Sequence, residues 1–183
     1  MAITYNIQIG KARVMDEVAK TTAYIGRKSV SEQDPGAYER ITAVDANREQ
    51  LDRYWTEACD GATRALAHWV ESVRSQSLTH HPEIGSDRDY LVKLAMPTNW
   101  DNAYLPVVNE TLLSYLVNSI VAKWLLIVQP GQASAYATLA AGGELQLGQM
   151  MLYRKRPTPR RSGPNTDDGL WHRADIWHRD ELW

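Results

Sequence analysis

The sequence predicts a mainly α fold: a four-helix bundle-like domain with a small two-stranded β element and an extended C-terminal arm. Apolar residues recur with helical spacing in four long segments. Two short segments instead have the composition and alternation of strands. From Pro157 the chain becomes proline-rich and charged, which favours an extended conformation. We therefore place the helical bundle domain at residues 1–156 and the arm at residues 157–183.

The segment Leu105–Val128 is the predicted centre of the bundle. Its apolar stripe widens until it covers almost the whole circumference, which predicts burial on nearly all sides. Pro106 suits a first helical turn, Asn102 is the candidate cap, and Gln129-Pro130-Gly131 ends the helix. The continuous apolar core of 17 residues contains Lys123 and is shorter than the roughly 20 residues of a membrane span. We expect a buried core helix and no membrane contact.

The other elements follow from the same patterns. Alternation predicts a strand over Ile3–Ile9, and a second strand over Tyr90–Met96 should pair with it. Periodicity predicts three further helices, and turn residues predict loops at 29–36 and 79–85. The predicted helices run from Lys11 to about Arg27, from a cap at Asp45 to about Ser77, and from Gln132 to about Arg154. Gly61 marks a kink or a close helix contact, and Gly142-Gly143 either permits close packing or breaks the last helix.

Composition excludes several classes of protein. The chain has 183 residues, a net charge of −2 and one cysteine, Cys59, so neither a disulfide framework nor a cysteine-based zinc site is possible within it. The N-terminal sequence lacks the apolar run of a signal peptide, which indicates synthesis and use in the cytosol.

Two groups of side chains are candidate metal ligands. The loop holding His80, His81 and Glu83, with Asp87 and Asp89 nearby, lacks a second cluster that would complete a ligand set. His68 and Glu71 have the Glu/His spacing of one helix face, but the additional carboxylates of a di-iron site are missing. No nucleophile motif or phosphate loop is present. We expect no metal, no cofactor and no catalytic residues.

A strongly basic segment follows the last predicted helix. It places five positive charges within residues 154–161, at Arg154, Lys155, Arg156, Arg160 and Arg161. These side chains are candidates for contact with nucleic-acid phosphate or with an acidic protein surface. The alternative is a solvated linker, or a helix C-terminus whose dipole favours cations.

The arm ends in an imperfect six-residue repeat, LWHRAD followed by IWHRDELW. Trp171, Trp177 and Trp183 are six residues apart, so an extended strand would place all three on one face. Indoles either fold back on their own bundle or dock on another protein. The predicted partner-binding residues are Leu170, Trp171, Ile176, Trp177, Leu182 and Trp183.

Four segments together resemble a known class of protein. They are KARVMDEVAKTTAYIGRKS after the first strand, DANREQLDRYWTEACDGATRAL, VNSIVAKWLLI and MMLYRKRPTPRR. They resemble uncharacterised proteins of phages and prophages of gut bacteria, and the small helical head–tail connector (neck adaptor) proteins of tailed phages. The resemblance covers about residues 1–161 and does not extend to the tryptophan repeat.

The resemblance implies a structural protein of the virion and not an enzyme. Such adaptors form homo-oligomeric rings, typically dodecamers, assembled in the bacterial cytoplasm. They sit below the portal protein, contact tail or neck proteins, let DNA pass through the lumen and grip the portal with a C-terminal arm. The alternative function is a nucleic-acid-binding accessory protein without sequence specificity, acting through residues 154–161. A metal-dependent helical enzyme around His68, His80 and His81 is the third hypothesis.

Overall fold

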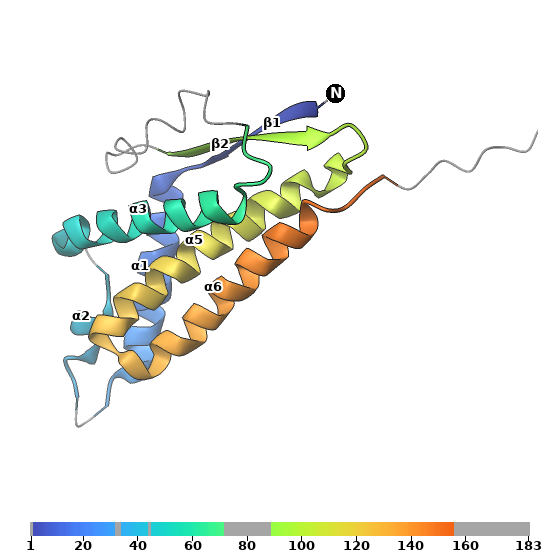
Figure 1. Ribbon diagram of the computed structural model, residues 1–183. Coiled ribbons are helices and arrows are strands. Elements are labelled where there is room, and N and C mark those ends of the chain that lie inside the picture. The colour runs from blue at the N-terminus through green and yellow to red at the C-terminus, as the bar shows by residue number, and fades with distance from the viewer. Residues whose placement is uncertain (1, 32–33, 44, 72–88, 156–183) are drawn as a thin grey trace, which may run out of the picture.

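The computed structural model describes residues 2–31, 34–43, 45–71 and 89–155. Within these residues the fold is mainly α, with one two-stranded sheet, as the sequence predicts (Figure 1). The elements, in chain order, are β1 (Ala2–Ile9), α1 (Lys11–Ser29), α2 (Ala37–Ile41), the 3-10 turn η1 (Asp45–Asn47), α3 (Arg48–Ala65), β2 (Tyr90–Pro97), the 3-10 turn η3 (Asn102–Tyr104), α5 (Leu105–Val128) and α6 (Pro130–Met150).

Helix α5 is the centre of the bundle, with α1, α3 and α6 packed around it (Figure 1). Its buried side chains are Val108, Leu112, Leu113, Tyr115, Leu116, Ile120, Val121, Trp124 and Leu125. The bounds of this helix were predicted correctly, but its burial was overestimated. Leu126 and Ile127 are 66% and 62% exposed, because the neighbouring helices leave this part of its last turn uncovered. At the other end, Asp101 and not Asn102 caps the preceding turn, accepting from the backbone N–H of Ala103 at 3.1 Å.

The predicted pairing of the two strands is confirmed. β1 and β2 are antiparallel, with Ile7 opposite Val92 and Ile9 opposite Tyr90, and these four side chains are buried against the helices. Leu91, on the outer face, is 56% exposed. Two strands alone are marginal in water, so the sheet depends on the bundle beneath it.

The second predicted helix is wrong at both ends. It begins at Arg48 after the turn η1 instead of at a cap on Asp45, and it ends at Ala65 instead of near Ser77. The chain then turns and joins the free edge of β2, where the N–H of Ala95 donates to the carbonyl of Trp69 at 2.7 Å. The apolar residues after Ala65 therefore belong to a segment that pairs with the edge of the sheet. Helical periodicity alone does not reveal this pairing.

Two smaller differences concern short or glycine-containing segments. Helix α2 was not predicted, since five residues give no periodic signal. It packs so closely on α1 that a Cβ at Gly26 would lie 3.2 Å from the backbone of Tyr38. Helix α6 ends at Met150 and continues without a break through Gly142-Gly143.

Gly61 lies where α3 crosses α5, which settles the alternatives in favour of a close helix contact. A Cβ on Gly61 would lie 2.2 Å from the hydroxyl oxygen of Tyr115 and 3.4 Å from its Cζ. Tyr115 is buried, and on its other side a Cβ at Gly143 of α6 would lie 3.4 Å from its Cβ. The side chain of Tyr115 therefore sets how closely α3 and α6 approach α5.

Candidate functional site

The C-terminal end of α6 is fixed to the turn that follows β2. The indole N–H of the buried Trp100 donates to the carbonyl of Met150 at 3.1 Å. The N–H of Lys155 donates to the carbonyl of Asn99 at 2.8 Å, and Trp100 and Arg154 form an antiparallel bridge. The last described residues, up to Lys155, are therefore held to this turn by backbone and side-chain hydrogen bonds.

Only the first two residues of the predicted basic segment fall within the described chain. The Arg154 guanidinium donates to the carbonyls of Met151 and Tyr153, at 3.0 and 3.2 Å. Met151 is the residue at which α6 terminates, so the first of these bonds caps the C-terminal end of the helix. The Tyr153 carbonyl also accepts from the backbone N–H of Asp101 at 3.4 Å. Lys155 is exposed. The other basic residues, Arg156, Arg160 and Arg161, lie outside the described residues.

The six predicted partner-binding residues also lie outside the described residues. They are Leu170, Trp171, Ile176, Trp177, Leu182 and Trp183. Their assignment stays a prediction, as does the boundary between bundle and arm at residue 156.

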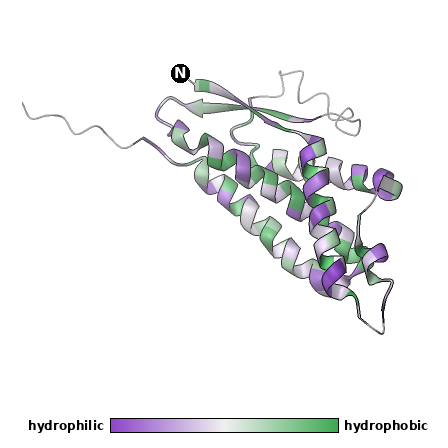
Figure 2. Ribbon diagram, turned by 180° about the vertical axis from the view of Figure 1, so that it is seen from behind, coloured by the Kyte–Doolittle hydropathy of each residue, from purple (hydrophilic) through white to green (hydrophobic). Residues whose placement is uncertain are grey.

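The solvent side of α6 is almost free of charge. Spacing of three and four residues aligns a set of side chains that we call the outer row, consisting of Ser134, Thr138, Ala141, Leu145, Gln149 and Leu152. All six are exposed, and Leu145 and Leu152 are 64% and 61% exposed. From Pro130 to Leu152 the sequence has one charged residue, Glu144. Figure 2 accordingly shows α6 mostly in white and green.

Two shallow grooves flank the outer row near the C-terminal end of α6. One, of about 480 Å³, lies between α3 and α6 and is lined by Ala65, Ala141, Glu144, Leu145, Gly148, Gln149 and Leu152. The other, of about 310 Å³, is lined by Tyr104, Val107, Gln146, Gln149, Met150 and Tyr153. Tyr104 and Tyr153 stack there with their ring centroids 4.6 Å apart. The outer row thus forms an uncharged ridge between two hollows, with its large apolar side chains, Leu145 and Leu152, in its C-terminal half.

Two helical glycines border this ridge with nothing packed on them. Within the described residues, a Cβ at Gly142 or at Gly148 would meet no atom within 4 Å. Glycine inside a helix costs about 1 kcal/mol relative to alanine. The described part of the chain gains no packing in return at these two positions, in contrast to Gly61 and Gly143.

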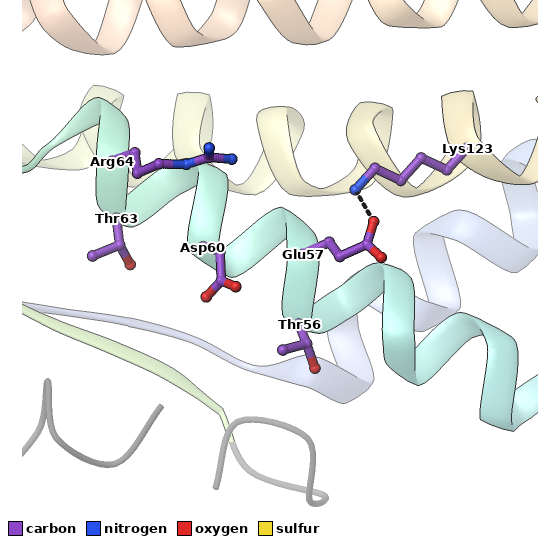
Figure 3. A pocket seen from close by; sticks show the side chains of 6 residues that line it. All are labelled: Thr56, Glu57, Asp60, Thr63, Arg64 and Lys123. Atoms are coloured by element: carbon purple, nitrogen blue, oxygen red, sulfur yellow. Dashed lines mark hydrogen bonds and ion pairs between the residues drawn. The ribbon is translucent and has the colours of Figure 1, made fainter. Parts of the chain in front are cut away.

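A larger groove between α3 and α5 is polar and internally paired. It measures about 740 Å³ and is lined by Thr56, Glu57, Asp60, Thr63, Arg64 and Lys123 (Figure 3). Lys123 donates to Glu57 at 2.6 Å. The Thr56 hydroxyl donates to the backbone of its own helix, and the Thr63 hydroxyl contacts both Cys59 O and the Tyr90 hydroxyl. These hydroxyls are engaged in structural hydrogen bonds.

The candidate metal ligands do not come together in the described residues. Asp89 instead accepts from the N–H of Lys11 at 3.0 Å, at the N-terminus of α1. His68 is in the turn after α3, with its ring against Trp69, so it does not share a helix face with Glu71. His80, His81, Glu83 and Asp87 lie outside the described residues. No group of three or more His, Cys, Asp or Glu side chains suited to a metal occurs in the described part of the chain.

Cys59 is fully buried in α3, as expected for a small core residue. Burial raises the pKa of its thiol well above the ordinary value, and the nearby Asp60 carboxylate adds to this effect. A thiol with a raised pKa is a poor nucleophile, since the thiolate is the reactive form.

The segment Asn102–Val128 is long and apolar enough to cross a membrane by length and composition. In the structure it is the packed centre of the bundle, and its lysine, Lys123, is paired with Glu57 of α3. The packing observed here is that of a core helix.

No family model, no curated protein and no solved structure matches this chain. The fold and the surfaces described above are therefore the basis of any functional argument.

Sequence reasoning missed the outer row. The small residues of this helix predict close backbone approach to another helix, which does not identify the side that faces solvent. The signal that could have revealed the row is the scarcity of charge on every face of residues 130–152, since the solvated side of a bundle helix normally carries charged side chains.

Proposed function

We propose that this protein is a structural virion protein of a tailed phage. It acts as a head–tail connector (neck adaptor) that forms a ring below the portal and attaches through its C-terminal arm. The single observation that supports the proposal best is the outer row of α6, an exposed and uncharged surface that ends close to the last described residue, Lys155. Exposed leucines within an uncharged row, such as Leu145 and Leu152, are typical of a site of protein–protein contact.

The remaining features fit the same role. The bundle is held together by a continuous core around α5, so it supplies a rigid body for assembly. The basic segment begins beside the outer row, where Lys155 is exposed, and would face DNA in the lumen or an acidic surface of the portal. The resemblance in layout to neck adaptors supports the proposal independently of the surface.

The test is the solution mass of the full chain and of a chain ending at residue 161, measured by light scattering over a range of concentrations. We expect the full chain to form a ring, or an oligomer whose mass rises with concentration, and the shortened chain to lose it. Negative-stain images of the full-length oligomer should show a closed ring with a central channel.

A monomer in both proteins at every concentration would overturn the ring. Steep salt dependence of DNA binding by the unassembled chain would instead support the nucleic-acid-binding accessory protein.

A further inference from the structure

The outer row is an uncharged surface of α6 and of the turn after it, apolar at Leu145 and Leu152, and it lacks a partner in the described chain. Its two leucines, Leu145 and Leu152, are more than 60% exposed and lie over a groove of about 480 Å³. Gly142 and Gly148 leave the backbone of α6 open to close approach from outside. Both features leave room along this helix for a peptide segment.

The sequence that follows the described chain contains a segment suited to this surface. Residues 170–183 contain three tryptophans at intervals of six residues. In an extended strand, successive indoles would be about 20 Å apart. The outer row, from Ser134 to Leu152, extends over about 27 Å at 1.5 Å per residue. Two neighbouring indoles therefore fit along the row at once.

Charge complementarity favours the same pairing. Glu144 lines the groove and has no ion-pair partner among the described residues. In the repeat, an arginine follows each of the first two tryptophans after one residue, at Arg173 and Arg179. In a strand, this spacing places each arginine on the same face as the indole before it. An indole in the groove would thus bring an arginine toward the single charge of α6.

The length of the connecting chain permits the contact. Residues 156–169 separate Lys155 from the repeat. Fully extended, they reach about 46 Å at about 3.3 Å per residue. Because Lys155 is fixed close to the outer row through Asn99, this reach exceeds the length of the row.

We propose that residues 170–183 dock on the outer row of α6, with the arm of one copy lying on α6 of the next copy in the ring. The contact joins two different surfaces, so it is heterologous, and heterologous contacts close into rings when the rotation permits. The indoles occupy the grooves beside Leu145 and Leu152, and Arg173 or Arg179 pairs with Glu144. The inference that the docking crosses from one copy to the next rests on the proposed function, whereas the pairing of arm and row does not.

The experiment mixes two full-length variants that are each defective in one of the two surfaces. The arm variant carries Trp171→Ser, Trp177→Ser and Trp183→Ser. The row variant carries Leu145→Lys and Leu152→Lys, at positions whose exposure lets the bundle fold. Each variant is monomeric alone, and the mixture gives a species of twice the chain mass of 20.7 kDa, because one intact arm meets one intact row. Leu91→Lys, at an equally exposed leucine on β2, is the control and assembles like the unmodified chain.

A charge exchange tests the orientation within the same experiment. Glu144→Arg weakens assembly at least tenfold in concentration, and Arg173→Glu combined with Arg179→Glu in the same chain restores it. Failure of the mixture to form the double-mass species, or assembly by either variant alone, overturns the pairing of arm and row. A ring formed by the unmodified chain together with a mixture that stays monomeric refutes this contact while leaving the connector function intact. A mixture that forms the double-mass species while the unmodified chain is monomeric supports the pairing, refutes its exchange between copies and counts against the ring.

Discussion

The contact between Gly61 and Tyr115 predicts a substitution effect whose sign depends on a single hydroxyl group. In the unmodified chain, Gly61→Ala places a methyl group 2.2 Å from the hydroxyl oxygen of Tyr115, so the ring or the α3–α5 spacing must shift. Overpacking of a core costs about 1–3 kcal/mol. Alanine gains about 1 kcal/mol over glycine in a helix. The net effect is a loss of up to about 2 kcal/mol.

The same substitution should be stabilising once the hydroxyl is removed. In a Tyr115→Phe background the atom nearest to the new methyl group is the ring Cζ at 3.4 Å, which is close to ordinary contact. Only the helix-propensity gain of about 1 kcal/mol then remains. The coupling free energy between the two positions, from a double-mutant cycle, is therefore about 1–3 kcal/mol.

The assay is urea unfolding followed by circular dichroism, on the two single variants, the double variant and the unmodified chain. Equal effects of Gly61→Ala in both backgrounds would refute the proposed contact. A coupling of the opposite sign would mean that the tyrosine hydroxyl stabilises the pair in some other way.

Three further predictions concern single groups. Gly142→Ala, which meets open space, should raise the free energy of unfolding by about 1 kcal/mol in unassembled protein, and a loss of stability in urea would contradict the open environment. Asp89→Ala removes the acceptor for the Lys11 N–H and should cost about 1 kcal/mol, with Asp89→Asn largely retaining stability in the same denaturation assay. Because burial raises the pKa of Cys59, the native state keeps a proton that the unfolded state loses above about pH 8.5, so stability falls as pH rises beyond that value. Unfolding midpoints at pH 7 and pH 9.5 should show this fall, and Cys59→Ala should flatten it; a fall of equal size in the variant would exclude the thiol as its source.

Strong periodic signals predicted the framework of the fold. The bounds of α5 followed from its apolar stripe together with Pro106 at its start and Gln129-Pro130 at its end. The strands were recognised because alternation is a direct consequence of their geometry. Antiparallel pairing then lets the two short strands satisfy each other's backbone hydrogen-bonding groups.

The misplaced end of α3 shows where periodicity is insufficient. Leu66 and Val70 continue the helical spacing, yet the backbone turns after Ala65 and the chain pairs with Ala95 and Lys93 of β2. The free edge of β2 offers backbone hydrogen bonds to this segment as an alternative to those of a continued helix. Helical periodicity in the sequence carries no information about this edge. The short α2 was missed for a related reason, because its position depends on α1 and not on its own five residues.

For the candidate site, the sequence identified residues but not their surroundings. The sequence groups Arg154 with the other basic side chains, whereas in the structure its guanidinium donates to the carbonyls of Met151 and Tyr153, just after α6. The outer row depends on which side of α6 faces α5, and small residues on all sides of the helix do not reveal that orientation.

The anchoring of the chain at Lys155 has a mechanical consequence. A pull on anything attached beyond this residue is transmitted first to the hydrogen bond between Lys155 and Asn99, and next to the one between Trp100 and Met150. These two bonds join the end of α6 to the turn that leads from β2 into α5, so the load is shared between the longest helices of the bundle. A pulling force would therefore load α5 and α6 together before it could separate the C-terminal end of α6 from the bundle.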